Sequence, residues 1–211
     1  MAIDTVEELT TFKMTAQLQD EDGDSLTLSE LDAMVLEVYE SRTETIVRSK
    51  RDAKNINDVT ITSPGVLTWL GQIEDTRIVN SDTRLGGIEQ HVAQFEYAFG
   101  NLGSQGSETD PFTTTSGSNL ITVSWPGHGL TTPMVFEDHV FFVTGDTVGG
   151  LNLNGRFRVH AIADGDNFTI VHKCSASSAE GPAGGNVSMW VNGRVGLQQV
   201  IFPVRRNRRD C

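Results

Sequence analysis

Short runs of alternating apolar and polar residues, separated by glycine, proline and aspartate turns, are the feature that most constrains this fold. From residue 12 to 18, every second side chain is apolar, which is the pattern of a strand with one buried face. Similar short runs occur at residues 34–39, 46–50, 59–61, 66–70, 91–99, 120–125, 139–143, 155–162, 168–172 and 187–191. The segment 74–83 fits either a short helix or a loop. We therefore predict an all-β chain of small antiparallel sandwiches or barrels.

The charge of the chain is divided unevenly between its two halves. Residues 1–110 hold 21 acidic and 8 basic residues, whereas residues 111–211 hold 7 acidic and 8 basic residues, giving a net charge of −12. Such a shift near residue 110 indicates two domains. The acidic half repels phosphate, so we expect no nucleic-acid partner.

A segment rich in glycine and serine around residues 100–118 marks the predicted boundary between the domains. It carries few apolar side chains and several turn-forming residues, so it cannot bury a core of its own. We predict a β-sandwich at 1–105, which the resemblance described below implies to be immunoglobulin-like, a linker at 106–118, a small barrel or sandwich at 119–200, and a basic tail at 201–211.

The arrangement of acidic, histidine and cysteine residues does not predict an enzyme or a metal centre. Asp20, Asp22 and Asp24 sit in a turn whose glycine and later glutamate miss the spacing of a helix-loop-helix calcium site, and whether they bind an ion stays open. His172 and Cys174 share a strand face, but no third ligand lies nearby in the sequence. No nucleophile elbow or phosphate-binding loop occurs. We expect no catalytic residue, no metal and no cofactor.

Two groups of residues are candidates for an interface. Trp69, Trp125 and Trp190 are either core residues or a stacking surface for a sugar. The arginines near the end of the chain form either a solvated tail or a contact with an acidic neighbouring subunit; they are Arg205, Arg206, Arg208 and Arg209.

We expect neither a membrane-spanning segment nor a secretory signal in this sequence. No run of apolar residues is long enough for a membrane-spanning helix, and the first residues are acidic rather than a secretory signal, so we expect no membrane partner. Cys174 and Cys211 cannot form a disulfide framework, which suits assembly in a reducing cytoplasm.

The second half contains three distinctive stretches: Gly127-His128-Gly129-Leu130, a glycine- and asparagine-rich turn at 149–155, and Asn167-Phe168-Thr169-Ile170. With these motifs, residues 118–172 or so resemble a β module of tailed-bacteriophage virion proteins. Glu137-Asp138 replaces the usual Gly-Asp step. More weakly, the runs 20–28, 34–39, 63–69 and 94–97 are similar to the N-terminal immunoglobulin-like domain of phage baseplate upper proteins.

This resemblance implies a structural protein of the virion, in the tail, neck or baseplate, which attaches fibres or neighbouring subunits to the particle. Its expected partners are other virion proteins and further copies of itself, and its expected location is the virion, after assembly in the host cytoplasm. Two alternatives stay open: a decoration protein of the head, and a receptor- or carbohydrate-binding module.

Overall fold

The computed structural model describes residues 6–7, 10–20, 22–54, 59–62, 65–79, 88–99, 103–132, 140–144, 146–191 and 194–205. Those residues form strands β1 to β18 and a single 3-10 helix, η1 (Ile73–Thr76), with no α-helix among them. None of the described segments is a helix long and apolar enough to cross a membrane. The predicted all-β fold class is confirmed.

The chain divides into two compact units. Unit 1 consists of residues 1–29, 36–95 and 196–211, and unit 2 consists of residues 30–35 and 96–195. Two long strands, β3 (Leu31–Glu40) and β7 (Ile88–Phe99), contribute residues to both.

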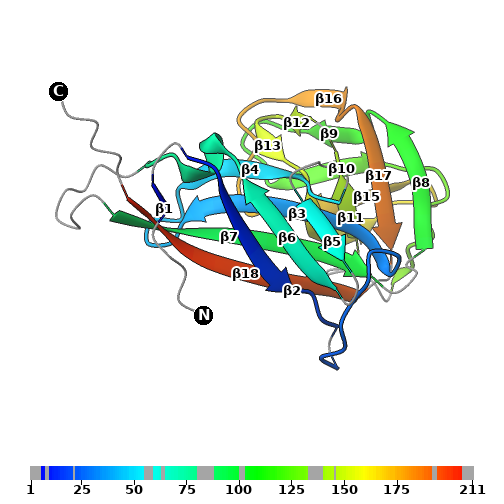
Figure 1. Cartoon of the computed structure of the whole chain (residues 1–211). Helices are drawn as coiled ribbons and strands as arrows, with labels where there is room; N and C mark the ends of the chain where they lie inside the picture. Colours follow the sequence, from blue (N-terminus) through cyan, green and yellow to red (C-terminus); the bar gives the residue numbers. More distant parts are fainter. Residues whose placement is uncertain are drawn as a thin grey trace. The chain divides into compact units, whose positions relative to one another are not determined.

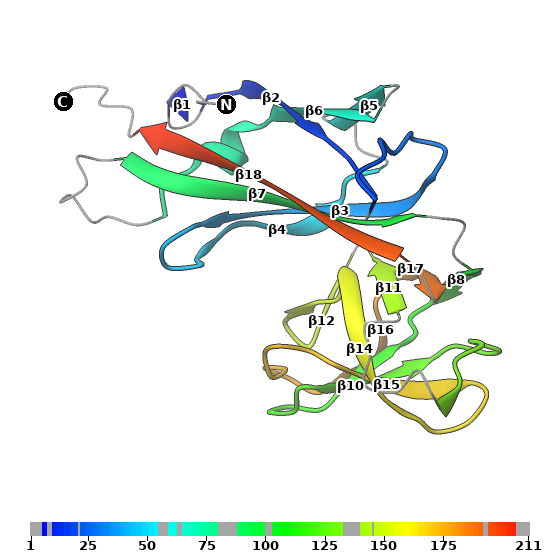
Figure 2. The same ribbon diagram turned by 90° about the horizontal axis from the view of Figure 1, so that it is seen from below.

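Unit 1 is built from two sheets, which Figures 1 and 2 show as separate layers. The first sheet has the order β1-β18-β7-β3-β4, in which β1 (Val6–Glu7) pairs in parallel with β18 (Arg194–Arg205), and β4 (Ile46–Asp52) forms the other edge. The second sheet is an antiparallel set with the order β2-β6-β5, made of β2 (Phe12–Gln17), β6 (Val66–Gly71) and β5 (Val59–Thr62).

Aromatic rings from both sheets fill the core of unit 1. The Trp69 ring lies 5.0 Å from the Phe12 ring, 5.9 Å from the Phe95 ring and 5.8 Å from the Phe202 ring, in edge-on contacts. Trp69, Phe95 and Phe202 have no exposed surface, and edge-on aromatic contacts add to the free energy gained by burying rings of this size. Unit 1 is therefore a β-sandwich with an aromatic centre.

Unit 2 is organised around a single eight-stranded sheet with a barrel-like curl. Its strand order is β16-β9-β10-β15-β14-β11-β17-β8. These strands are β8 (Gly103–Thr109), β9 (Phe112–Thr114), β10 (Leu120–Ser124), β11 (Val140–Val143), β14 (Gly155–Ile162), β15 (Asn167–Val171), β16 (Glu180–Ala183) and β17 (Asn186–Val191). A small hairpin of β12 (Thr147–Val148) and β13 (Leu151–Asn152) completes the unit.

Alternate residues of these strands form the core of unit 2. Along β10, for example, Ile121 and Val123 are buried, whereas the residues between and beside them are exposed. The buried alternates of β10, β14 and β15 meet rings such as Phe112 and Phe142, whose centroids lie 5.1 Å apart. The period of two in the sequence therefore identified the inward face of these strands.

The structure differs from the predicted domain boundaries in two places. Strands β8 and β9 occupy much of the predicted linker 106–118, because backbone hydrogen bonds hold β8 to β17 and β9 to β10, and Phe112 of β9 is buried in the core. Residues 201–205, assigned to a basic tail, are part of β18 in the first sheet, with Phe202 and Val204 buried. Unit 2 is therefore inserted between β7 and β18 of unit 1 along the sequence.

Candidate functional site

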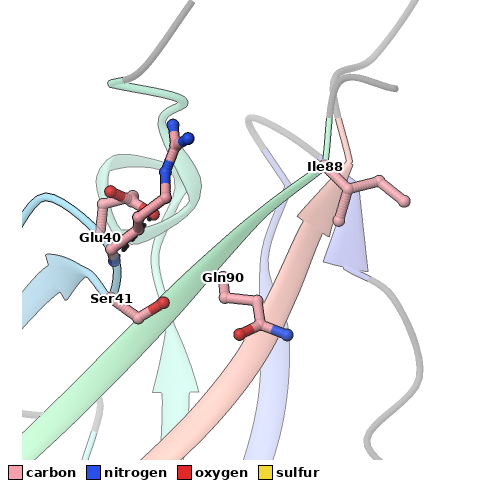
Figure 3. A pocket seen from close by; sticks show the side chains of 5 residues that line it. Glu40, Ser41, Ile88 and Gln90 are labelled. Carbon is pink, nitrogen blue, oxygen red and sulfur yellow. Dashed lines mark hydrogen bonds between the residues drawn. The ribbon is translucent and has the colours of Figure 1, made fainter. Parts of the chain in front are cut away.

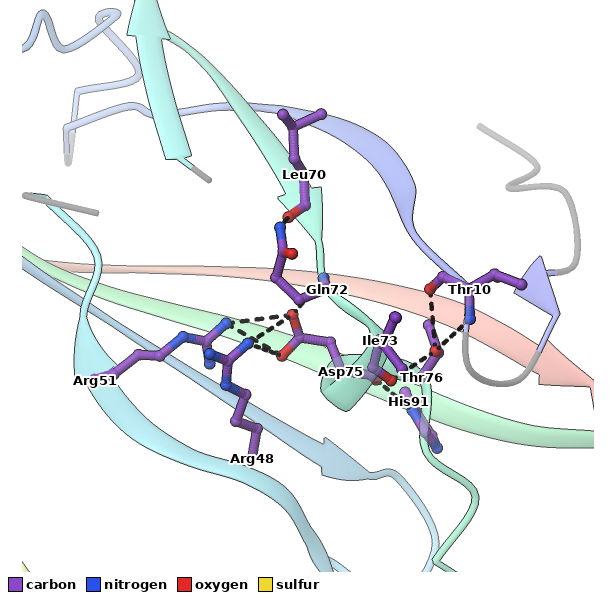
Figure 4. A network of polar contacts seen from close by, with 9 residues as sticks. All are labelled: Thr10, Arg48, Arg51, Leu70, Gln72, Ile73, Asp75, Thr76 and His91. Carbon is purple, nitrogen blue, oxygen red and sulfur yellow. Dashed lines mark hydrogen bonds and ion pairs between the residues drawn. The ribbon is translucent and has the colours of Figure 1, made fainter. Parts of the chain in front are cut away.

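An extended polar network in unit 1 surrounds the fully buried Asp75 in η1 (Figure 4). Its carboxylate accepts hydrogen bonds from Arg48 Nη1 at 3.3 Å and from Arg51 Nη2 at 3.1 Å, both on β4. It also accepts the backbone N–H of Gln72 at 2.8 Å. A buried carboxylate needs such partners because burial removes its hydration.

His91 connects this network to β7. Its Nδ1 lies 3.1 Å from the carbonyl oxygen of Asp75, and its Nε2 lies 3.0 Å from Glu89 Oε2, which also accepts the backbone N–H of Val79 at 3.1 Å. The His91 ring is fully buried and packs edge-on against Phe202. The carboxylates and the histidine are thus held by internal partners, and their hydrogen bonds join η1, β4 and β7.

A shallow hollow of about 330 Å³ lies where β3 turns into β4 (Figure 3). It is lined by Glu40, Ser41, Arg42, Ile88 and Gln90. The Glu40 carboxylate is already occupied: it accepts Thr43 Oγ1 at 2.6 Å, Thr43 N–H at 2.8 Å and Arg42 N–H at 3.1 Å.

These contacts control the ionisation of Glu40. Burial acts to raise its pKa, but the hydrogen bonds from Thr43 and the Arg42 amide, together with the Arg42 charge, outweigh burial and lower the pKa. The carboxylate is thus stabilised as an anion that closes the turn. Ser41, whose hydroxyl would need a neighbouring base to become a nucleophile, shares this lining with Glu40, Arg42, Ile88 and Gln90.

The Gly-His-Gly-Leu motif of unit 2 forms a corner against the turn that precedes β15. His128 is 1% exposed, and its Nδ1 accepts the backbone N–H of Leu130 at 3.0 Å. Its Nε2 therefore carries the hydrogen and donates it to the carbonyl oxygen of Asp164 at 3.0 Å. Gly127 N–H donates to Gly165 O and to Asp166 Oδ1, both at 3.1 Å. The most reactive side chain of the motif is thus used to hold two loops together.

The turn on the other side of this corner is itself stabilised by a carboxylate. Asp164 Oδ1 accepts the Asp166 backbone N–H at 2.8 Å and the Asn167 side-chain amide at 3.0 Å. These hydrogen bonds, led by that of Asp166, lower the pKa of Asp164. Hydrogen bonds within the chain therefore fix both loops that meet at this corner.

The acidic loop and the His172–Cys174 pair also form local turns. Asp20 Oδ1 accepts the backbone N–H groups of Asp22 at 3.0 Å and Asp24 at 2.8 Å, as turn-forming aspartates do. His172 Nδ1 accepts the Cys174 N–H at 2.9 Å. No group of three or more potential ligands that could hold a metal ion is found within the ranges the structure describes.

The three tryptophans differ in accessibility. Trp69 is fully buried and Trp125 is 1% exposed, so both are core residues. The Trp125 indole donates to the carbonyl oxygen of Gln105 at 3.2 Å. Trp190 is half-buried and packs edge-on against Phe141 at 6.4 Å. The three rings are therefore not brought together in one exposed platform.

Of the four arginine candidates, Arg205 ends β18 and is exposed. Arg206, Arg208 and Arg209 lie outside the described residues. Arg205 belongs to the outward-facing set of β18, whose even-numbered neighbours Phe202 and Val204 face the core.

Sequence reasoning missed the outward face of β18. Leu197 is 48% exposed and Ile201 is 55% exposed, although both are large apolar residues. Between them, Gln199 Nε2 donates to Tyr39 OH at 3.2 Å and to Gln94 Oε1 at 2.8 Å, which joins β18, β7 and β3 across the sheet. The sequence carries no signal for this face, because apolar residues occur on both sides of β18.

Comparisons with known proteins give little further information. No family model matches the sequence, and no curated protein matches it. Among solved structures, the chain is similar to the phage phi92 endosialidase, with a TM-score of 0.35 and 13% sequence identity. The match covers 93% of this chain and 30% of the endosialidase chain. A TM-score this low carries no argument about fold or function.

Proposed function

We propose that this chain is a structural protein of a tailed-phage virion, in the tail, neck or baseplate, where it attaches fibres or neighbouring subunits. The observation that carries the proposal is the Gly127–Leu130 corner. The motif on which the phage resemblance rests is used for hydrogen bonds between loops, with His128 buried and both its ring nitrogens occupied. A module built in this way serves as a rigid support.

The proposed role involves no catalytic step, cofactor, nucleic acid or membrane. Its partners are other virion proteins and further copies of the chain, and it is assembled into the particle in the host cytoplasm. The excess of acidic residues before residue 110 and the run of arginines after residue 204 support packing between unlike surfaces of adjacent subunits.

The arginine contact is tested by replacing Arg205, Arg206, Arg208 and Arg209 with serine. Incorporation of the variant into particles should fall, and the remaining incorporation should lose its dependence on salt, because the screened ion pairs are gone. A matched control replaces Arg156 and Arg158, which are exposed on β14, with serine. Unchanged incorporation of the four-arginine variant, or an equal loss in the control, would contradict the proposed contact.

The carbohydrate-binding alternative rests on the accessible part of Trp190. A glycan array separates the two functions: the attachment role predicts no glycan binding by the isolated chain. Glycan binding that is lost in Trp190→Ala and kept in Trp125→Phe would favour the binding module.

A further inference from the structure

The outer face of β18, β7 and β3 in unit 1 combines exposed apolar side chains with polar groups that already satisfy one another. Ile201 is more exposed than the other exposed large apolar residues in the described part of the chain, and Leu197 lies four residues before it on the same face. Large apolar side chains exposed together on a sheet indicate an interaction surface. We call the surface of Leu197, Ile201, Gln199, Gln94 and Tyr39 the β18 face.

The polar side chains of the β18 face do not oppose its burial. Gln199 donates to Tyr39 OH and Gln94 Oε1, and Tyr39 OH lies 3.5 Å from the same Gln94 oxygen. Because these groups bond to each other, a partner can cover them without leaving those bonds unmade. These hydrogen bonds also hold the three side chains in place, so little conformational entropy is lost when a partner covers the face.

Charge is distributed along the β18 face in a self-complementary way. Glu37 and Glu44 lie close enough to Tyr39 that, after burial, their negative charges contribute to raising the pKa of its phenol. Arg205 lies six residues beyond Gln199 on the outward-facing side of β18, a distance of about 20 Å along the strand. The β18 face is thus flanked by acidic residues beside Tyr39 and by the basic Arg205 at the end of β18, and Ile201 lies between Gln199 and Arg205 in the sequence.

We propose that the β18 face binds a second copy of this chain about a two-fold axis, with the Ile201 side chains near the axis. In this arrangement, Arg205 of each copy lies over the acidic surroundings of Tyr39 in the other, as a self-complementary two-fold contact requires. The proposal deepens the contact between copies that the proposed function includes and rests on it in using Arg205, but it is tested on the isolated chain, without the virus particle.

The size of the face determines the strength of the contact. Three neighbouring strands of this length present on the order of 500 Å² per copy, or about 1,000 Å² in total. This lies at the low end for specific interfaces, so the dimer is weak and forms at micromolar to millimolar concentration of the free protein. A particle that holds copies side by side would raise their effective concentration and make the contact permanent.

The test is sedimentation velocity of the purified full chain over a range of concentrations. We expect a reversible monomer–dimer equilibrium, and we expect Ile201→Lys to raise its dissociation constant at least about tenfold. Leu120→Lys is the matched control, because Leu120 is a 37% exposed apolar residue of β10 outside the face, and it should leave the constant unchanged. Circular dichroism of both variants establishes that they are folded.

A charge exchange tests the orientation of the two copies. Glu44→Arg and Arg205→Glu should each weaken the dimer by roughly threefold to tenfold, and the two changes together should restore it, because the altered charges then face each other. A chain that is monomeric at all concentrations overturns the proposal, even if the β18 face then binds a different protein. So does a dimer that Leu120→Lys weakens and Ile201→Lys does not. Failure of particle incorporation while the isolated chain still dimerises, by contrast, bears on the virion role alone.

Discussion

Replacing Asp75 with asparagine removes the charge at the centre of the polar network in unit 1 and keeps the size of the side chain. Two guanidinium groups, 3.1 and 3.3 Å from the carboxylate, then lose their counter-charge. Breaking a buried ion pair costs roughly 3–5 kcal/mol. The Arg48 and Arg51 side chains keep 31% and 17% of their surface exposed, so water compensates part of the loss. We expect unit 1 to lose about 2–4 kcal/mol of its free energy of unfolding.

Urea unfolding measured by fluorescence provides the assay for Asp75→Asn. A background with Trp125→Phe and Trp190→Phe leaves Trp69, in the core of unit 1, as the reporter. With a urea dependence of about 2 kcal/mol per molar, the midpoint should fall by roughly 1–2 M. Asp24→Asn, an exposed residue in the same unit, should change stability by less than about 0.5 kcal/mol. An equally small effect of Asp75→Asn would refute the reasoning that the buried network holds unit 1 together.

Three further substitutions test individual contacts. Because the pKa of Glu40 is lowered in the folded chain, its contribution to stability is present above the unfolded pKa and is lost as pH falls through the folded pKa. The thermal midpoints of Glu40→Gln and wild type should therefore differ at pH about 7 and converge near pH about 3. A difference that stays constant with pH would contradict this. The pKa of Tyr39 is raised, so its contribution to stability is present below the unfolded pKa and is lost as pH rises through the folded pKa. In urea titrations above pH about 10, wild type should lose more stability than Tyr39→Phe. Parallel pH curves for the two proteins would contradict this role of Tyr39. His128→Ala removes a buried ring that contacts Phe168 and leaves two backbone groups without their partner. The free energy of unfolding of unit 2, followed by Trp125 fluorescence, should therefore fall by about 3 kcal/mol. A loss below about 1 kcal/mol would mean that this histidine does not hold the corner.

Most strands could be predicted from the sequence because one face of each is buried. The alternation at residues 120–124 and 155–162 reflects burial on one side of β10 and β14, and the turns between strands carry glycine and aspartate where the backbone needs them. These are local properties, set by residues close together along the chain.

The errors concern properties that depend on distant partners. The composition of residues 103–109 suggests a flexible segment, yet β17 pairs with this segment through backbone groups that every residue possesses. The return of β18 to the first sheet beside β7 is likewise a tertiary fact. Asp75 meets Arg48 and Arg51 from 27 and 24 residues away, so no spacing in the sequence announces the network.

For the candidate site residues too, the sequence identified some of the residues, but only the structure showed their surroundings. The sequence singled out His128 through the motif that carries it, but its buried, fully bonded position is visible only in the structure. The choice between core and surface for Trp69 and Trp125 also required the packing of several strands. Conversely, the exposure of Leu197 and Ile201 runs against their apolar character, so composition would have placed them inside.

Immunogold labelling of this chain on purified virus particles tests the attachment role most directly. The virion account predicts label clustered at one vertex or along the tail, where fibres or other subunits are held. Label spread over the head would instead indicate a decoration protein. Intact and detergent-opened particles without label, with the protein free in the lysate, would contradict the claim that the chain is a structural component of the virion.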